Sequence, residues 1–152
     1  MSLIGKVVKS FNFVLEIDGA PKFSMQKVTL PEIEIEETLH SAGSYEEKTP
    51  GRLKVSDLVC EKFMAYGDPT ENWAWEWLLQ VQNYELGNLV PANTAKNARL
   101  IAYQDDALTI AKIYELGKIW PKKIATGDFD KTSSDNVMET VTFSVTKFKK
   151  II

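Results

Sequence analysis

The alternation of apolar and polar positions along most of the chain predicts β-strands rather than helices. In the segment 10–18 the apolar side chains stand at every second residue, and Asp18 and Gly19 follow as a turn. The segment 22–30 repeats the alternation, so the two segments are predicted to form a hairpin. Further strands are predicted at 32–39, 53–63, 97–103, 108–116 and 137–148.

The strand predicted at 32–39 has faces of opposite character. Three of its glutamates share one face, and its isoleucines, Ile33 and Ile35, share the other. The acidic face consists of Glu32, Glu34 and Glu36. Nothing in the sequence adds the further oxygen ligands of a calcium site, and one side of an antiparallel sheet is commonly wet. A solvated face is therefore the simplest interpretation.

The next segment, 40–52 (HSAGSYEEKTPGR), is rich in small, charged and turn-forming residues, and it predicts a loop. Loops of this length in compact domains often have a function of their own. A mobile hairpin tip is the alternative, because exposed loops are often simply mobile.

One segment, from about 69 to 83, departs from the alternation and predicts a helix. Asp68 is suited to cap the free amides of the first turn, and Pro69 is tolerated there. With 3.6 residues per turn, Trp73 and Trp77 lie on one side, within an apolar stripe that can cover a sheet.

Trp75 and Leu79 fall on a different side of this helix, at roughly 200° and 240° from Trp73. They are four residues apart and can touch, so they form a second apolar patch. A patch that contains a tryptophan is typical of a contact with a partner. The alternative is that the loop predicted at 84–96 folds over the patch within the same chain.

These elements predict a mainly β fold: a small antiparallel β-barrel or two-sheet sandwich with one flanking helix. The 152 residues, 44% of them hydrophobic, suffice for the core of a single domain over 1–152. No apolar run approaches the ~18 residues of a membrane helix, and the N-terminus lacks the features of a secretory signal. We therefore expect the chain to fold in the cytoplasm.

The inventory of reactive side chains argues against catalysis. The chain has one histidine, His40, and one cysteine, Cys60, which on count alone permit a dyad. Such a dyad needs hydrogen-bond reach and an orienting group, whereas a lone cysteine in an apolar strand is usually a buried structural residue. The net charge of −3 provides no basic surface for gripping nucleic acid. We expect no enzymatic activity, no metal and no cofactor.

Four stretches, in this order, resemble the inner tail-tube proteins of contractile phage tails and phage-derived contractile injection systems. They are FNFVLEIDG (11–19) with FSMQKVTLPEIEIEE (23–37) after it, KTPGRLKVSDLVCEK (48–62), WAWEWL (73–78) and YELGKIWPKKIATGDFDKTSSDNVMETVTFSV (114–145). The resemblance spans nearly the whole chain.

The resemblance implies a β-barrel of two sheets with a helix on its flank, and subunits that close into six-membered rings. The rings stack into a hollow tube inside a contractile sheath and carry DNA or protein cargo. The related type VI secretion tube protein shares this architecture. The implied partners are other copies of the chain, the sheath, baseplate or spike proteins and a tape-measure protein, with no membrane and no cofactor.

Three groups of residues are expected to serve such an assembly. Trp75 and Leu79 are expected at the contact between subunits of a ring. The segment 40–52 is expected to reach the next ring, through His40, Tyr45, Glu46, Glu47, Lys48 and Arg52. A lumen that passes DNA should repel phosphate, which makes Glu32, Glu34 and Glu36 candidates for its wall.

Two other functions stay open at this point. The chain could be a monomeric β-barrel that binds a ligand in its mouth. It could also be a paralogue that initiates the tube in the baseplate.

Overall fold

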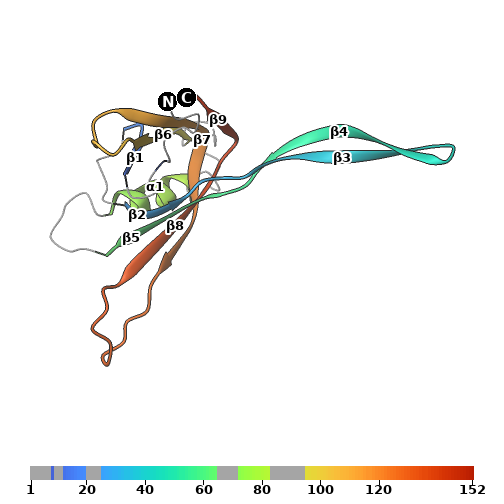
Figure 1. Ribbon diagram of the computed structural model, residues 1–152. Helices are drawn as coiled ribbons and strands as arrows, with labels where there is room; N and C mark the ends of the chain where they lie inside the picture. Colours follow the sequence, from blue (N-terminus) through green and yellow to red (C-terminus); the bar gives the residue numbers. More distant parts are fainter. Residues whose placement is uncertain (1–7, 9–11, 20–24, 65–71, 83–94) are drawn as a thin grey trace.

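The computed structural model describes residues 8, 12–19, 25–64, 72–82 and 95–152 (Figure 1). Within these residues the chain forms nine strands and one helix. The strands are β1 (Phe13–Ile17), β2 (Met25–Thr29), β3 (Ile33–Ala42), β4 (Tyr45–Val55), β5 (Leu58–Phe63), β6 (Lys96–Tyr103), β7 (Ile110–Thr126), β8 (Met138–Ser144) and β9 (Lys147–Lys150). The helix is α1 (Trp73–Gln82).

The described strands of the body pair in the order β1-β6-β7-β8-β5-β2, with β9 added to β7, and every pairing is antiparallel. They form two layers: β1, β6 and β9 with the first part of β7, and β2, β5 and β8 with its last part. The strands at the two ends of this path, β1 and β2, do not pair with each other among the described residues. The predicted hairpin of 10–18 with 22–30 is therefore wrong, since β1 pairs with β6 and β2 pairs with β5. The sandwich form of the predicted fold is therefore confirmed, and the described residues form no closed barrel.

Strand β7 passes from one layer to the other near Lys118. That residue has a positive φ of 52°, and the side-chain oxygen of Asn97 accepts its N–H at 3.3 Å. Just before it, Gly117 leaves room for β9, since a Cβ there would lie 3.1 Å from the Cβ of Lys147. A local distortion of this kind is how a single strand turns a corner between two packed sheets.

The helix α1 covers the core with the face predicted from its sequence. Trp77 is 2% exposed. The centroid of its ring lies 4.9 Å from the ring centroid of Trp73 and 5.6 Å from that of Phe143. Ala74, on the same side, is also buried. The packed stripe of the prediction is thus confirmed.

The start of the helix differs in detail from the prediction. The carbonyl of Asn72 accepts the N–H of Glu76 at 2.9 Å, which is the spacing of a helical bond and makes Asn72 the cap of the described helix. The predicted cap, Asp68, and the flanking residues 69–71 and 83 lie outside the described residues.

The loop predicted at 40–52 is wrong. These residues continue β3 and form most of β4, with a tight turn at Gly43, whose φ is +66°. The two strands make a long hairpin that projects from the body, here named the arm (Figure 1). The breakers Pro50 and Gly51 are accommodated by a register shift, at which the two residues Gly51 and Arg52 stand opposite Glu36 alone.

A charged pair is buried in the second layer. Lys62 on β5 and Glu139 on β8 are direct cross-strand partners, and their Nζ and Oε1 atoms lie 3.6 Å apart. Both side chains are less than a tenth exposed. A pair of this kind disfavours a slipped register between the two strands, because any slip would separate two buried charges.

Removing one member of this pair should destabilise the fold strongly. Glu139→Ala takes away the carboxylate that balances the Lys62 ammonium, and we expect a loss of about 3–5 kcal/mol in the free energy of unfolding by urea. The double variant Lys62→Met/Glu139→Leu removes both charges and should unfold near the wild-type midpoint. A Glu139→Ala protein as stable as the wild type would contradict this account of the pair.

Candidate functional site

The arm exposes an apolar face close to its root. In the register of the hairpin, Ile33 lies opposite Val55 and Ile35 lies opposite Leu53, so all four side chains share one side of the ribbon. Ile35 and Leu53 are 56% and 59% exposed. A two-stranded ribbon is marginally stable alone, and exposed apolar surface of this kind marks an interaction site.

The opposite face of the arm is charged. Glu34 lies opposite Lys54, and Lys54 also forms an ion pair with Glu36 at 2.5 Å. The hydrogen bond that Lys54 donates to Glu36, followed by the negative charge of Glu36, raises the pKa of Lys54. Because this pair is exposed, it contributes little to stability. The predicted division between Glu34 and Glu36 on one face and the isoleucines on the other is confirmed for the strand.

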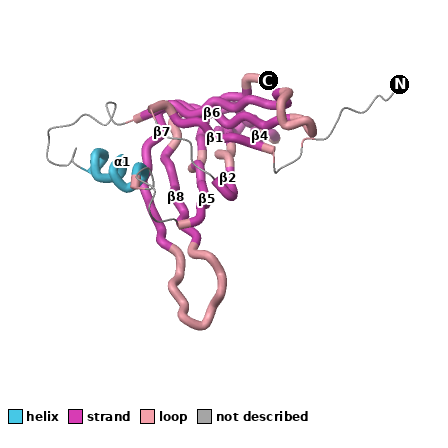
Figure 2. Tube along the Cα trace, turned by 90° about the vertical axis from the view of Figure 1, so that its left-hand side faces the viewer, coloured by secondary structure: helices cyan, strands magenta, loops and turns pink. Residues whose placement is uncertain are grey.

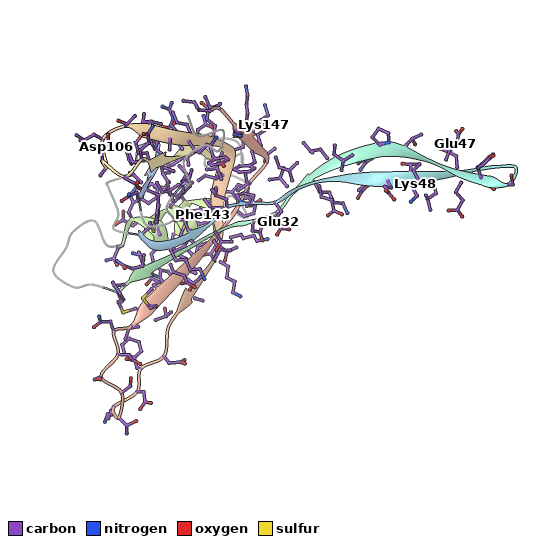
Figure 3. All side chains as sticks on the ribbon, viewed as in Figure 1. Glu32, Glu47, Lys48, Asp106, Phe143 and Lys147 are labelled. Carbon is purple, nitrogen blue, oxygen red and sulfur yellow. The ribbon has the colours of Figure 1, made fainter. Side chains whose placement is uncertain are left out.

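The root of the arm is fixed by two hydrogen bonds at Glu32. Its N–H donates to the Ser56 hydroxyl at 2.7 Å, and its carbonyl accepts the Ser56 N–H at 3.0 Å. Glu32 itself precedes β3. It therefore lies at the junction of body and arm, whereas Glu34 and Glu36 lie on the arm proper (Figure 3).

The residues predicted to reach another ring all lie on the arm. His40 pairs with Glu47 across the ribbon, Lys48 pairs with Leu39, and Tyr45 follows the turn. Their side chains are exposed, that of Tyr45 by 76%. Figure 3 shows Glu47 and Lys48 on the outer half of the projecting ribbon, away from the body.

The second apolar patch of α1 is also exposed. Trp75 is 39% exposed and Leu79 is 54% exposed, while Trp77 between them in sequence is buried. The alternative was that the segment 84–96 covers this patch, and residues 84–94 of that segment lie outside the described residues. The prediction that Trp75 and Leu79 face away from the core is therefore confirmed.

The cysteine–histidine dyad is not formed. Cys60 is fully buried in the core, and burial raises the pKa of its thiol to about 12. His40 lies on the exposed outer half of the arm. A protonated thiol in the core is inert, so Cys60 is a structural residue.

No metal site is found in the described part, and the space beneath its helix is too small for a ligand. The described residues contain no group of three or more His, Cys, Asp or Glu side chains that could hold a metal ion. The space beneath α1, lined by Trp73, Ala74 and Phe143 among others, has a volume of only about 10 Å³. A site for a small-molecule ligand needs a volume of several hundred Å³. No described helix is long and apolar enough to cross a membrane.

The structure adds one surface feature that the sequence did not reveal. Glu16, Arg99, Glu115 and Lys149 are successive cross-strand partners on β1, β6, β7 and β9, so charges of alternating sign cross the first layer. Each strand shows its alternation in the sequence, but the register that aligns the four residues depends on contacts between distant segments.

Comparison with known proteins relates this architecture to tube proteins. The sequence model of a family described as T4-like virus tail tube protein gp19 matches residues 9–149. A search of curated proteins finds no match.

Several solved structures share the fold. The anti-feeding prophage tube-terminating cap superposes with a TM-score of 0.83 at 14% identity, over 99% of this chain and 95% of that one. A chain of the PVC sheath–tube complex, from an extracellular contractile injection system in the extended state, gives 0.80 at 16% identity, over 95% and 91%. Hcp1 from Flavobacterium johnsoniae gives 0.52 at 14% identity, over 91% and 93%.

Proposed function

Because the chain belongs to the T4-like virus tail tube protein gp19 family, we propose that it builds the inner tube of a contractile tail or injection system. In this proposal six copies close into a ring, and the rings stack into a hollow conduit for DNA or protein cargo. The single observation that carries it is the family match, which covers 9–149 of the 152 residues. The exposed apolar surfaces of the arm and of α1 support it, since a subunit designed to remain alone would not expose them.

Trp75 and Leu79 are proposed as part of the contact within a ring. A ring made by rotation uses two different surfaces of each subunit, one for each neighbour. A tryptophan that stands beside a leucine and is not needed by the core suits such a contact, since tryptophan is enriched at interfaces.

The outer half of the arm is proposed to reach the next ring. It projects well beyond the body, and it carries charges of both signs at Glu46, Glu47 and Lys48. Complementary charges set register and orientation more than they add affinity. Such a contact would fix how one ring is rotated on the next.

The wall of the conduit is proposed to include the acidic face of the arm. Carboxylates at Glu34 and Glu36 would repel the phosphates of DNA and let it slide. Lys54 offsets part of this negative charge through its ion pair with Glu36. Most of the proposed repulsion of phosphate therefore comes from Glu34. Glu32, at the junction of body and arm, would line the wall beside them.

This proposal about the lumen predicts a definite position in the assembled tube. A cryo-EM reconstruction of assembled protein should place the Glu34 side chain on the inner wall. A reconstruction that places Glu34 on the outer wall would show that the acidic face has another purpose.

The proposed partners are those of a tube that assembles in the bacterial cytoplasm inside a contractile sheath. They are further copies of the chain, the sheath, baseplate or spike proteins and a tape-measure protein. The role is structural rather than enzymatic and uses no cofactor.

A second candidate is a protein that terminates or initiates a tube, because the fold of a tube-terminating cap fits the chain as well as that of the sheath–tube complex. Such a protein would form single rings that do not stack.

A charge on the helix patch should separate assembly from folding. In Trp75→Glu, a carboxylate replaces the exposed ring, and burying it in a subunit contact would be costly. We expect a folded monomer in sedimentation velocity, with a circular dichroism spectrum and a urea midpoint close to those of the wild type.

The matched control is Gln80→Glu, which adds the same charge at an exposed position of the same helix. It should assemble as the wild type does. Wild-type rings from Trp75→Glu would place the subunit contact elsewhere. A large loss of stability in this variant would instead make Trp75 part of the subunit's own core.

A further inference from the structure

Two surfaces of this chain expose apolar side chains that its own core does not bury. One is the arm-base face, formed by the exposed Ile33, Ile35 and Leu53 and by Val55, which is half-buried against the core. The other is the helix patch, formed by Trp75 and Leu79. Each presents large side chains next to one another rather than singly, and that is what distinguishes an interaction surface from ordinary exposed hydrophobic residues.

The arm-base face is structurally separate from the rest of the arm. The register shift at Glu36 opposite Gly51 and Arg52 marks its outer limit. Beyond this bulge the same side of the ribbon is mostly polar: Glu37, Lys48 and Glu46 lie there with a single exposed leucine, Leu39. The inner half of the arm is therefore suited to an apolar contact, and the outer half to a charged one.

The chain cannot join these two surfaces within one copy. The arm projects away from the body, whereas α1 packs against the body through Trp77 (Figure 1). A side view along the arm shows α1 on the flank of the two layers (Figure 2). A second copy can bring its arm to this helix, and a contact between two different surfaces of identical chains is the kind that closes a ring.

Charges beside the two surfaces are complementary. Arg52 stands opposite Glu36 in the register shift that limits the arm-base face, and its side chain is exposed. Glu76 immediately follows Trp75 on the helix, and it is exposed as well. A guanidinium at the edge of one apolar surface and a carboxylate at the edge of the other would orient the contact.

We propose that the arm-base face of one copy packs on the helix patch of the neighbouring copy in the same ring. This proposal rests on the proposed function and refines it: the two surfaces are the two halves of a single contact. Arg52 then acts within the ring, and the outer half of the arm stays free to reach the next ring.

Site-directed cross-linking tests this contact in the assembled protein. Leu53→Cys and Leu79→Cys are introduced into the same chain, and assemblies are treated with a short bifunctional maleimide. Cys60 stays in place, since it is fully buried with a thiol pKa raised to about 12. We expect a ladder of covalent oligomers up to the hexamer on denaturing gels. A mixture of the two single-cysteine chains should stop at the dimer, because each copy then carries one accessible thiol.

The matched control moves one cysteine by one residue. Lys54 neighbours Leu53 but lies on the opposite face of the ribbon. Lys54→Cys with Leu79→Cys should therefore give at least tenfold less cross-linked product. Equal ladders from the two pairs would overturn the proposal. A second alternative is tested with Ile110→Cys, at an exposed apolar position of β7. A ladder from Leu53→Cys with Ile110→Cys, and none from Leu53→Cys with Leu79→Cys, would also overturn the proposal.

Electron microscopy of the same samples separates this proposal from the one on which it rests. Rings that give no ladder overturn the contact and leave the tube subunit intact. If wild-type protein forms no rings, the proposed function itself fails. If the wild type assembles but the cysteine variants do not, the charge exchange Arg52→Glu/Glu76→Arg tests the contact instead. Each single change should reduce ring formation, and the double variant should restore it. A double variant that forms no more rings than the single variants overturns the contact.

Discussion

The structure depends on a constraint that its arm imposes: a two-stranded ribbon with an apolar face cannot bury that face by itself. Hairpins gain stability when a third strand, a helix or a partner covers one side. Here the ribbon of β3 and β4 projects from the body with Ile35 and Leu53 more than half exposed. In the proposed assembly the missing cover comes from another copy of the chain. A subunit of this kind buries these side chains only when it is assembled.

The single described helix carries a second exposed apolar surface. Its buried face, centred on Trp77, fastens it to Phe143 and the sandwich core. Its other face leaves Trp75 and Leu79 exposed. The tight attachment through Trp77 makes the exposed face a rigid platform, which lowers the entropy lost when a partner binds to it.

The sequence was informative where structure is set by local periodicity. Alternation located most strands, and the 100° advance per residue correctly separated the buried Trp77 from the exposed Trp75. The sequence was misleading where proline or glycine, which usually interrupt strands, stand inside long strands. Pro50 and Gly51 suggested a loop, yet a register shift admits them to β4. The strand predicted at 108–116 likewise runs on past Pro121, and β7 ends only at Thr126 after a similar shift. Bulges depend on the partner strand, and cross-strand pairing is not a local property of the sequence.

The most direct test of the central claim is electron microscopy of the purified wild-type protein at high concentration. The account predicts six-membered rings, with stacks or tubes of uniform diameter as the concentration rises. Stacks would favour a tube subunit, and rings that never stack would favour a tube-terminating or tube-initiating protein. A homogeneous 17.2 kDa monomer at every concentration would contradict the account, because the apolar surfaces of the arm and helix would then have no partner among copies of this chain.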